Sequence, residues 1–206
     1  MEEIKYEYKS LDDENLLKFM LKISKYYNNT IRQKIKYKGK RVSFGSHRVT
    51  LNKLFFDKQF VHISSFSDAD SRFYKPLPCQ NEGYNEFCYN CIEQIKTANL
   101  DGKTRAICIY RMSKLPLIKY IFKKINIGEL NNITIYEEET FVNKKCKKEN
   151  FVHIRYIDEN IYYYIKLQEV IDIKRGNYYS FYCAFPVFNS GKKRELDKMF
   201  GKVKRN

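Results

Sequence analysis

The chain has 206 residues, and its 39 Lys and Arg against 24 Asp and Glu give a formal charge of +15. With 43% apolar and 16% aromatic residues it can bury a core, which excludes a disordered basic tail as its main state. Its apolar runs are a few residues long, far short of the roughly 20 that cross a bilayer, so we expect no transmembrane helix and no membrane partner.

The N-terminal segment is expected to be mainly helical. Apolar residues at helical spacing predict a long amphipathic helix over residues 12–36. A basic turn at 36–41 leads to a short strand or loop at 42–44, and a second helix is expected over 50–60. A polar stretch followed by two prolines favours a connection or domain boundary near 64–80.

The middle of the chain alternates between helix and strand. Residues 82–98 carry apolar side chains on one helical face, and residues 103–112 have the pattern of a buried strand. Ser113 is suited to cap a further helix that has Pro116 in its first turn.

The pattern changes after residue 132. Segments rich in β-branched and aromatic residues predict antiparallel strands, and residues 158–160 join two of them as a hairpin. A basic terminal helix is expected over 190–204. The expected strands are 133–136, 151–157, 161–167 and 178–185.

These elements predict an α+β fold, with a helical N-terminal part (about 1–130), antiparallel strands (about 133–188) and a C-terminal basic helix. We expect a single compact domain over 1–206, with a possible division into a helical arm (1–75) and an α+β body (76–206).

Four of the six cysteines are compatible with a zinc site. Cys88 and Cys91 have the spacing of a zinc knuckle, but no second pair follows, and both lie on the apolar face of the expected helix. Core cysteines are therefore preferred to zinc for the set Cys79, Cys88, Cys91 and Cys108.

Cys146 is the leading candidate for an intermolecular disulfide. Four lysines flank it, and their charge favours the reactive thiolate. Cys79, next to Pro78 in a polar segment, is the second candidate. The alternative is that both thiols are exposed and have no role.

The sequence shows no catalytic or cofactor motif, and we expect neither catalysis nor a cofactor. His47, His62 and His153 are scattered, and no nucleophile or metal motif accompanies them. Asp68 and Asp70 are interpreted as a turn, and the acidic run 137–139 as a solvated edge.

Two basic clusters near the C-terminus are candidates for nuclear import. The alternatives are a solvated helix face or contacts with phosphates. The clusters consist of Lys192, Lys193 and Arg194, and of Lys202, Lys204 and Arg205.

The 18 tyrosines favour self-association, because tyrosine offers a large contact area with a polar tip. Near pH 10.5 reference pKa values give a net charge of roughly −12, so an assembly of this protein would be driven apart by its own charge. Strand alternation sends Tyr162 and Tyr164 to one face and Tyr163 to the other. The candidates for this alkaline switch are Tyr162, Tyr163, Tyr164, Tyr178 and Tyr179.

The chain resembles a polyhedrin of an insect virus, in particular of a nudivirus. The resemblance rests on the size near 25 kDa, the tyrosine content, the six cysteines, the basic clusters 192–194 and 202–205, and a composition typical of an AT-rich genome. The resemblance implies a structural protein without catalysis. Such a protein packs with itself into a crystalline occlusion body in the host nucleus, embeds virions, protects them outside the cell and dissolves at alkaline pH.

The alternative is a basic viral nucleic-acid-binding protein that uses the C-terminal Lys and Arg clusters. The segment 154–164 followed by 166–173 is similar to the strand-strand-helix unit of viral Bro-type DNA-binding domains. Steep salt dependence would distinguish this function from matrix formation.

Overall fold

The computed structural model describes residues 4, 13–51, 54–67, 97–100, 103–142, 147–159, 161–174, 176–187 and 190–202. The helices are α1 (Asp13–Tyr26), the π-helix η1 (Tyr27–Arg32), α2 (Lys58–Ile63), α4 (Ile109–Ser113), α5 (Pro116–Asn126) and α6 (Ser190–Phe200). The strands are β1 (Lys36–Tyr37), β2 (Lys40–Ser43), β3 (Arg48–Leu51), β4 (Leu54–Asp57), β5 (Ser65–Ser67), β6 (Thr97–Leu100), β7 (Lys103–Ile107), β8 (Ile133–Val142), β9 (Lys147–Asp158), β10 (Ile161–Val170) and β11 (Tyr178–Pro186).

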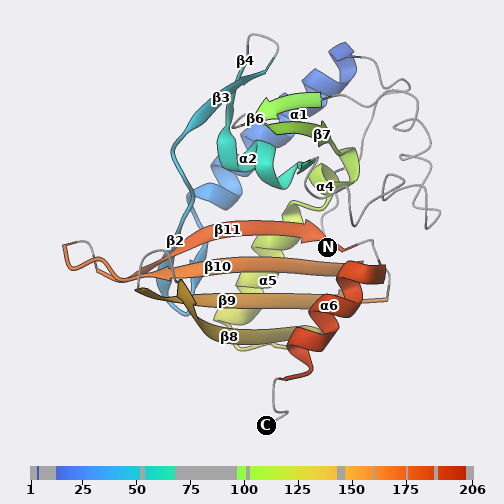
Figure 1. The fold of residues 1–206 in the computed structure, drawn as a ribbon. Coiled ribbons are helices and arrows are strands. Elements are labelled where there is room, and N and C mark those ends of the chain that lie inside the picture. The colour runs from blue at the N-terminus through green and yellow to red at the C-terminus, as the bar shows by residue number, and fades with distance from the viewer. Residues whose placement is uncertain are drawn as a thin grey trace.

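The main sheet has the strand order β1-β2-β11-β10-β9-β8. Neighbouring strands are antiparallel except β2 and β11, which are parallel. Helix α5 crosses one face of the sheet, and α6 lies against the other (Figure 1). The smaller elements, including the three-stranded sheet β5-β7-β6 and the antiparallel pair β3-β4, gather above β11, on its side away from β10 (Figure 1).

The four long strands form where β-branched and aromatic residues were expected, and the hairpin at residues 158–160 is confirmed. The alternation of tyrosines is also confirmed: Tyr163 joins the main core with α1 and α5, whereas Tyr162 and Tyr164 pack with α6 on the opposite face. Both faces of this sheet are therefore partly covered, which explains its high aromatic content.

The N-terminal helix is shorter than predicted. The apolar face expected from Leu16 to Ile31 is buried, but the α-helix continues as the π-helix η1 and ends at Arg32. Ile35 lies beyond the helix and is still buried. Lys38 and Gly39 both have positive φ, which gives the type I′ turn that folds residues 36–41 into the β1-β2 hairpin.

The expected helix over 50–60 is wrong. Residues 48–51 and 54–57 pair as the antiparallel strands β3 and β4, and α2 begins only at Lys58. The cause is local: the Asp57 side chain accepts hydrogen bonds from the backbone N–H groups of Gln59 and Phe60, at 2.8 and 3.2 Å. An N-cap fixes where a helix starts, so the residues before it take the strand conformation that Val49 and Phe56 favour.

Three other boundaries also differ from the prediction. The strand expected over 103–112 stops at Ile107, because Cys108 caps α4. Ser113 ends α4, and Leu115 takes the N-cap position of α5. The helix expected over 82–98 lies mostly outside the described residues, although residues 97 and 98 belong to β6.

The Bro-like unit also lacks its helix, because residues 166–170 belong to β10. The two strands before it are present as β9 and β10.

The α+β class is confirmed, with the antiparallel strands and the C-terminal helix in the expected places. The N-terminal part is less helical than expected, since it supplies β1 to β7. One core cluster joins α1, η1, α2 and α5 to the main sheet. The pairings of β2 with β11 and of β5 with β7 also connect early and late segments of the chain.

Candidate functional site: a basic cleft beside the β1-β2 hairpin

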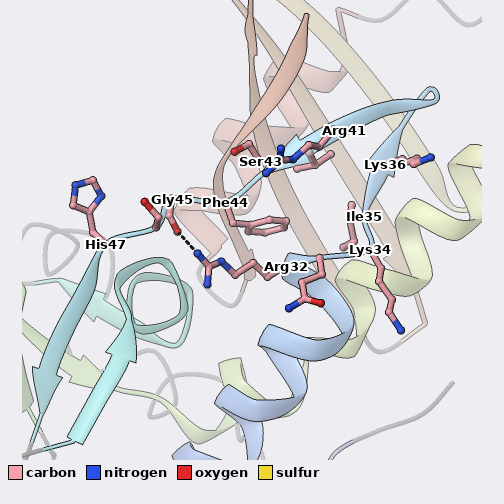
Figure 2. Close-up of a pocket in the computed structure, with 12 residues that line it drawn as sticks. Arg32, Lys34, Ile35, Lys36, Arg41, Ser43, Phe44, Gly45 and His47 are labelled. Atoms are coloured by element: carbon pink, nitrogen blue, oxygen red, sulfur yellow. Dashed lines mark hydrogen bonds between the residues drawn. The ribbon is translucent and has the colours of Figure 1, made fainter. Parts of the chain in front are cut away.

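A cleft of about 960 Å³ lies between the end of η1, the β1-β2 hairpin and the segment that leads into β3. We call it the basic cleft. Figure 2 shows its labelled side chains, with Arg32 directed toward Gly45 and with Lys34 and Lys36 extending on the opposite side of the view. The basic cleft is lined by Arg32, Gln33, Lys34, Ile35, Lys36, Arg41, Val42, Ser43, Phe44, Gly45, Ser46 and His47.

Apolar packing holds the wall of the basic cleft in place. Phe44 is buried, stacks on Phe181 with ring centroids 4.5 Å apart, and meets the edge of Tyr27 at 5.8 Å. Val42 and Ile35 are also buried, and their backbones are joined by a hydrogen bond. The polar residues between them are therefore presented to solvent by a backbone that the core fixes.

The main sheet neutralises two lysines of the hairpin. The Nζ atom of Lys38 lies 2.8 Å from Oε1 of Glu137, and that of Lys40 lies 3.3 Å from Oε1 of Glu169. The hydrogen bond from Lys38 lowers the pKa of Glu137 below its ordinary value, so this carboxylate stays charged. Neither Lys38 nor Lys40 lines the basic cleft.

The cations that do line the basic cleft are not neutralised in this way. Lys34, Lys36 and Arg41 are exposed, and among the described residues none of them pairs with a carboxylate. Lys36 and Arg41 are also direct partners across the hairpin. Like charges opposite each other in a sheet destabilise it, and an anion bound between them would relieve the repulsion.

Arg32 is the exception, because it is held by neighbouring groups. Its guanidinium lies 3.4 Å from the buried Asp57 carboxylate and donates a hydrogen bond of 3.5 Å to the carbonyl of Gly45. These contacts tie the end of η1 to the start of α2. Arg32 is therefore a positioned wall residue with about a third of its side chain exposed.

The structure describes four of the six residues in the two C-terminal clusters predicted for nuclear import or phosphate contacts, and two of these four already contact neighbouring side chains. Lys192 pairs with Glu195 at 2.6 Å, and the ammonium of Lys193 lies 6.0 Å from the ring centroid of Tyr162. Arg194 and Lys202 are exposed. Lys204 and Arg205 lie outside the described residues.

The tyrosines proposed as an alkaline switch are mostly inside the fold. Tyr162, Tyr163, Tyr164 and Tyr179 are buried, and burial raises the pKa of each phenol above its ordinary value. Tyr178 is half-buried. In the folded protein these four phenols therefore ionise at a higher pH than free tyrosine, which opposes the charge reversal expected from the sequence.

Most cysteine predictions fall outside the described residues, including both disulfide candidates, Cys146 and Cys79. Of the zinc set only Cys108 is described, and its sulfur accepts a hydrogen bond from the backbone N–H of Arg111 at 3.4 Å. Among the residues that the structure describes, no three His, Cys, Asp or Glu side chains come together as a metal site.

The acidic run interpreted as a solvated edge lies on the outermost strand, β8. Glu137 and Glu139 form ion pairs with lysines, and Glu138 contacts His153. Of the three histidines, His47 lines the basic cleft, whereas His62 lies in α2 and His153 in β9.

Sequence reasoning identified the basic turn at residues 36–41 but assigned it no function. The missing signal is the ion pairing: Lys38 and Lys40 look like their neighbours in the sequence, and only the pairing to Glu137 and Glu169 separates them from the unpaired cations. Alternation along β1 would have separated Lys36 from Tyr37, since these residues point to opposite faces.

Comparison with known proteins finds no matching family, no matching curated protein and no matching solved structure. In the described part of the chain, no helix is both long enough and apolar enough to cross a bilayer.

Proposed function

We propose that this protein binds the phosphate backbone of nucleic acid in the basic cleft. The observation that carries the proposal is the separation of charges around the hairpin. Lys38 and Lys40 are paired with the sheet, whereas Lys34, Lys36 and Arg41, which line the cleft, have no carboxylate partner among the described residues.

The geometry favours a polymer over a small phosphate ester. Lys34 lies in the turn after η1 and Lys36 in β1, so the unpaired cations come from separate elements of the cleft wall and offer several separate contacts to a phosphate backbone. A Gly-rich loop that wraps a single phosphate is absent from the described cleft, whose lining contains one glycine, Gly45. Lysine and arginine contacts of this kind carry no sequence information, so binding is expected to be non-specific.

The matrix function stays a prediction of the sequence. Its contacts were expected from tyrosines, and eight tyrosines of the described chain are buried in the interior. Because these phenols are not available to a second copy in this fold, we favour nucleic-acid binding. The eight are Tyr27, Tyr37, Tyr110, Tyr156, Tyr162, Tyr163, Tyr164 and Tyr179.

The proposal is tested by fluorescence anisotropy with a short labelled single-stranded DNA and its duplex. Three or four cations, each neutralising one phosphate, predict a slope of about −2 to −3 in log K against log salt for the single strand. Between about 50 and about 200 mM salt the affinity should then fall about 20- to 50-fold. The triple variant K34A/K36A/R41A should lose most of the affinity and most of the slope.

The matched control is K192A/K193A/R194A, which removes the same three charges from α6. If non-specific attraction to the whole protein were responsible, the two triple variants would weaken binding equally. Loss of binding in the α6 variant alone would move the site to the C-terminal cluster. Salt-independent binding by the wild type would refute a phosphate-backbone contact altogether.

A further inference from the structure

A second cavity, of about 480 Å³, opens on the face of the main sheet that α6 covers only in part. Alternation along the strands brings Glu138 of β8, His153 of β9 and Lys166 of β10 to this face. They lie next to the apolar cluster that Tyr162 forms with α6 and are not part of it. The cavity also brings together His62 and His153, which the sequence separates widely. We call it the sheet-face pocket.

A hydrogen-bonded chain forms one wall of the sheet-face pocket. Nε2 of His153 lies 2.9 Å from Oε1 of Glu138, and its Nδ1 lies 2.7 Å from the hydroxyl of Tyr164. Since a carboxylate accepts only, Nε2 carries the proton, and the tyrosine hydroxyl donates to Nδ1. Burial lowers the pKa of His153, which keeps the imidazole neutral. This wall is therefore satisfied internally.

The other cations of the sheet-face pocket are held by an ion pair or by hydrogen bonds, although Nε of Arg111 is buried without a hydrogen-bond partner among the described residues. Lys192 pairs with Glu195. The Arg105 and Arg111 guanidinium groups donate to the carbonyl oxygen of Ser65, and the Arg111 guanidinium also stacks on the ring of Phe66 at 3.6 Å. Both arginines are buried and anchor the turn between α2 and β5.

Lys166 differs from these cations. Its ammonium lies 3.9 Å from the ring centroid of Phe151 and 5.2 Å from that of Tyr182. Within the described residues it has no carboxylate partner, and its side chain is half-buried. Aromatic faces attract a cation but do not neutralise it, so an unbalanced positive charge faces the sheet-face pocket.

The remaining lining is apolar, with Ile63, Phe185, Leu196 and Met199 around the polar groups. A site that combines an apolar cavity with a few oriented polar groups is typical of small-molecule binding. Its volume suits a ligand of modest size. The Lys166 ammonium, which has no carboxylate partner among the described residues, would pair with one negative charge.

The geometry points to a binding site for a small organic carboxylate, with the carboxylate paired to Lys166 and an apolar body against Phe185, Leu196 and Met199. The carboxylate would accept charge-assisted hydrogen bonds from the ammonium, which the two aromatic rings cannot do as well. Glu138 stays engaged with His153 and does not compete for Lys166. This site is independent of the basic cleft, with which it shares no lining residue.

The test uses the full chain and the fluorescent probe 8-anilinonaphthalene-1-sulfonate, an apolar anion whose emission rises when it leaves water. Octanoate should displace the probe, whereas octan-1-ol, which has the same chain without the charge, should displace it about tenfold less well. The variant K166M should lose the preference for octanoate and should keep the apolar stem that covers Phe151.

Two further variants separate charge from folding. K166R retains the cation and should retain octanoate displacement, whereas K174M, at an exposed position outside the pocket, should behave as the wild type. The inference is overturned if octan-1-ol displaces the probe as well as octanoate does, if K166M binds octanoate normally, or if K34A/K36A/R41A abolishes the displacement. Nucleic-acid affinity should be the same in K166M and wild type.

Discussion

Asp57 links the fold to the basic cleft, and its substitution separates two roles of one carboxylate. Its Oδ1 accepts two backbone hydrogen bonds at the start of α2, and its Oδ2 faces the Arg32 guanidinium at 3.4 Å. Loss of an N-cap side chain costs about 1 kcal/mol, and hydrogen bonds to a charged acceptor raise the figure to about 2 kcal/mol. We therefore expect D57A to lower the free energy of unfolding by about 2 kcal/mol, or the Tm by about 4–8 °C.

The variant D57N isolates the charge. Asparagine caps helices about as well as aspartate, so D57N should lose no more than about half as much stability. It also removes the carboxylate that pairs with Arg32, and the Arg32 guanidinium should then form an ion pair with a phosphate of the bound nucleic acid. Affinity should rise and the salt slope should steepen by about 0.7. Urea unfolding and anisotropy on both variants measure the two effects. Equal destabilisation in D57A and D57N, with no gain in affinity, would refute this division of roles.

Three further predictions concern buried groups of the main sheet. Y163F should be neutral or stabilising in urea unfolding, because the Tyr163 hydroxyl is buried without a partner among the described residues. Y164F should lower the free energy of unfolding by about 1 kcal/mol, because it removes the hydrogen bond to His153. A loss of stability in both variants would contradict this. Burial lowers the pKa of His153 in the folded protein, so as the pH falls the unfolded state takes up a proton before the folded state does. The free energy of unfolding should therefore decrease below about pH 6.5, and H153Q should reduce this decrease. Burial raises the pKa of seven of the eight buried phenols, so absorbance at alkaline pH should show them ionising at higher pH in the folded protein than after urea has unfolded the chain. Their titration near pH 10 in the folded protein would restore the alkaline switch.

The sequence predicted elements well where one physical signal dominates. Helix α5 shows this, since Leu117, Ile121 and Ile125 recur at helical spacing and are buried in the structure. The long strands β8 to β11 are equally clear from their β-branched and aromatic residues. The helix predicted over residues 50–60 was wrong because their apolar spacing suits a short helix and a hairpin alike. The N-cap at Asp57 decides between the two.

The candidate sites were harder to predict than the fold. Lys34 and Lys38 are chemically identical, and their difference comes from Glu137, a residue far away in the sequence. The same holds for Lys166 and Lys192, of which one meets aromatic rings and the other a carboxylate. A single sequence records charges but not their partners, so unpaired charges become visible only in three dimensions.

The parallel pairing of β2 with β11 has a consequence for the order in which the protein is made. Val42 pairs with Tyr179, so the hairpin that carries the cleft cations docks on a strand that leaves the ribosome much later. Contacts this distant in the sequence form late in folding. A growing chain that has not yet released β11 therefore has no strand on which to fix the hairpin, so the basic cleft takes its final shape only after the residues near 179 have been made.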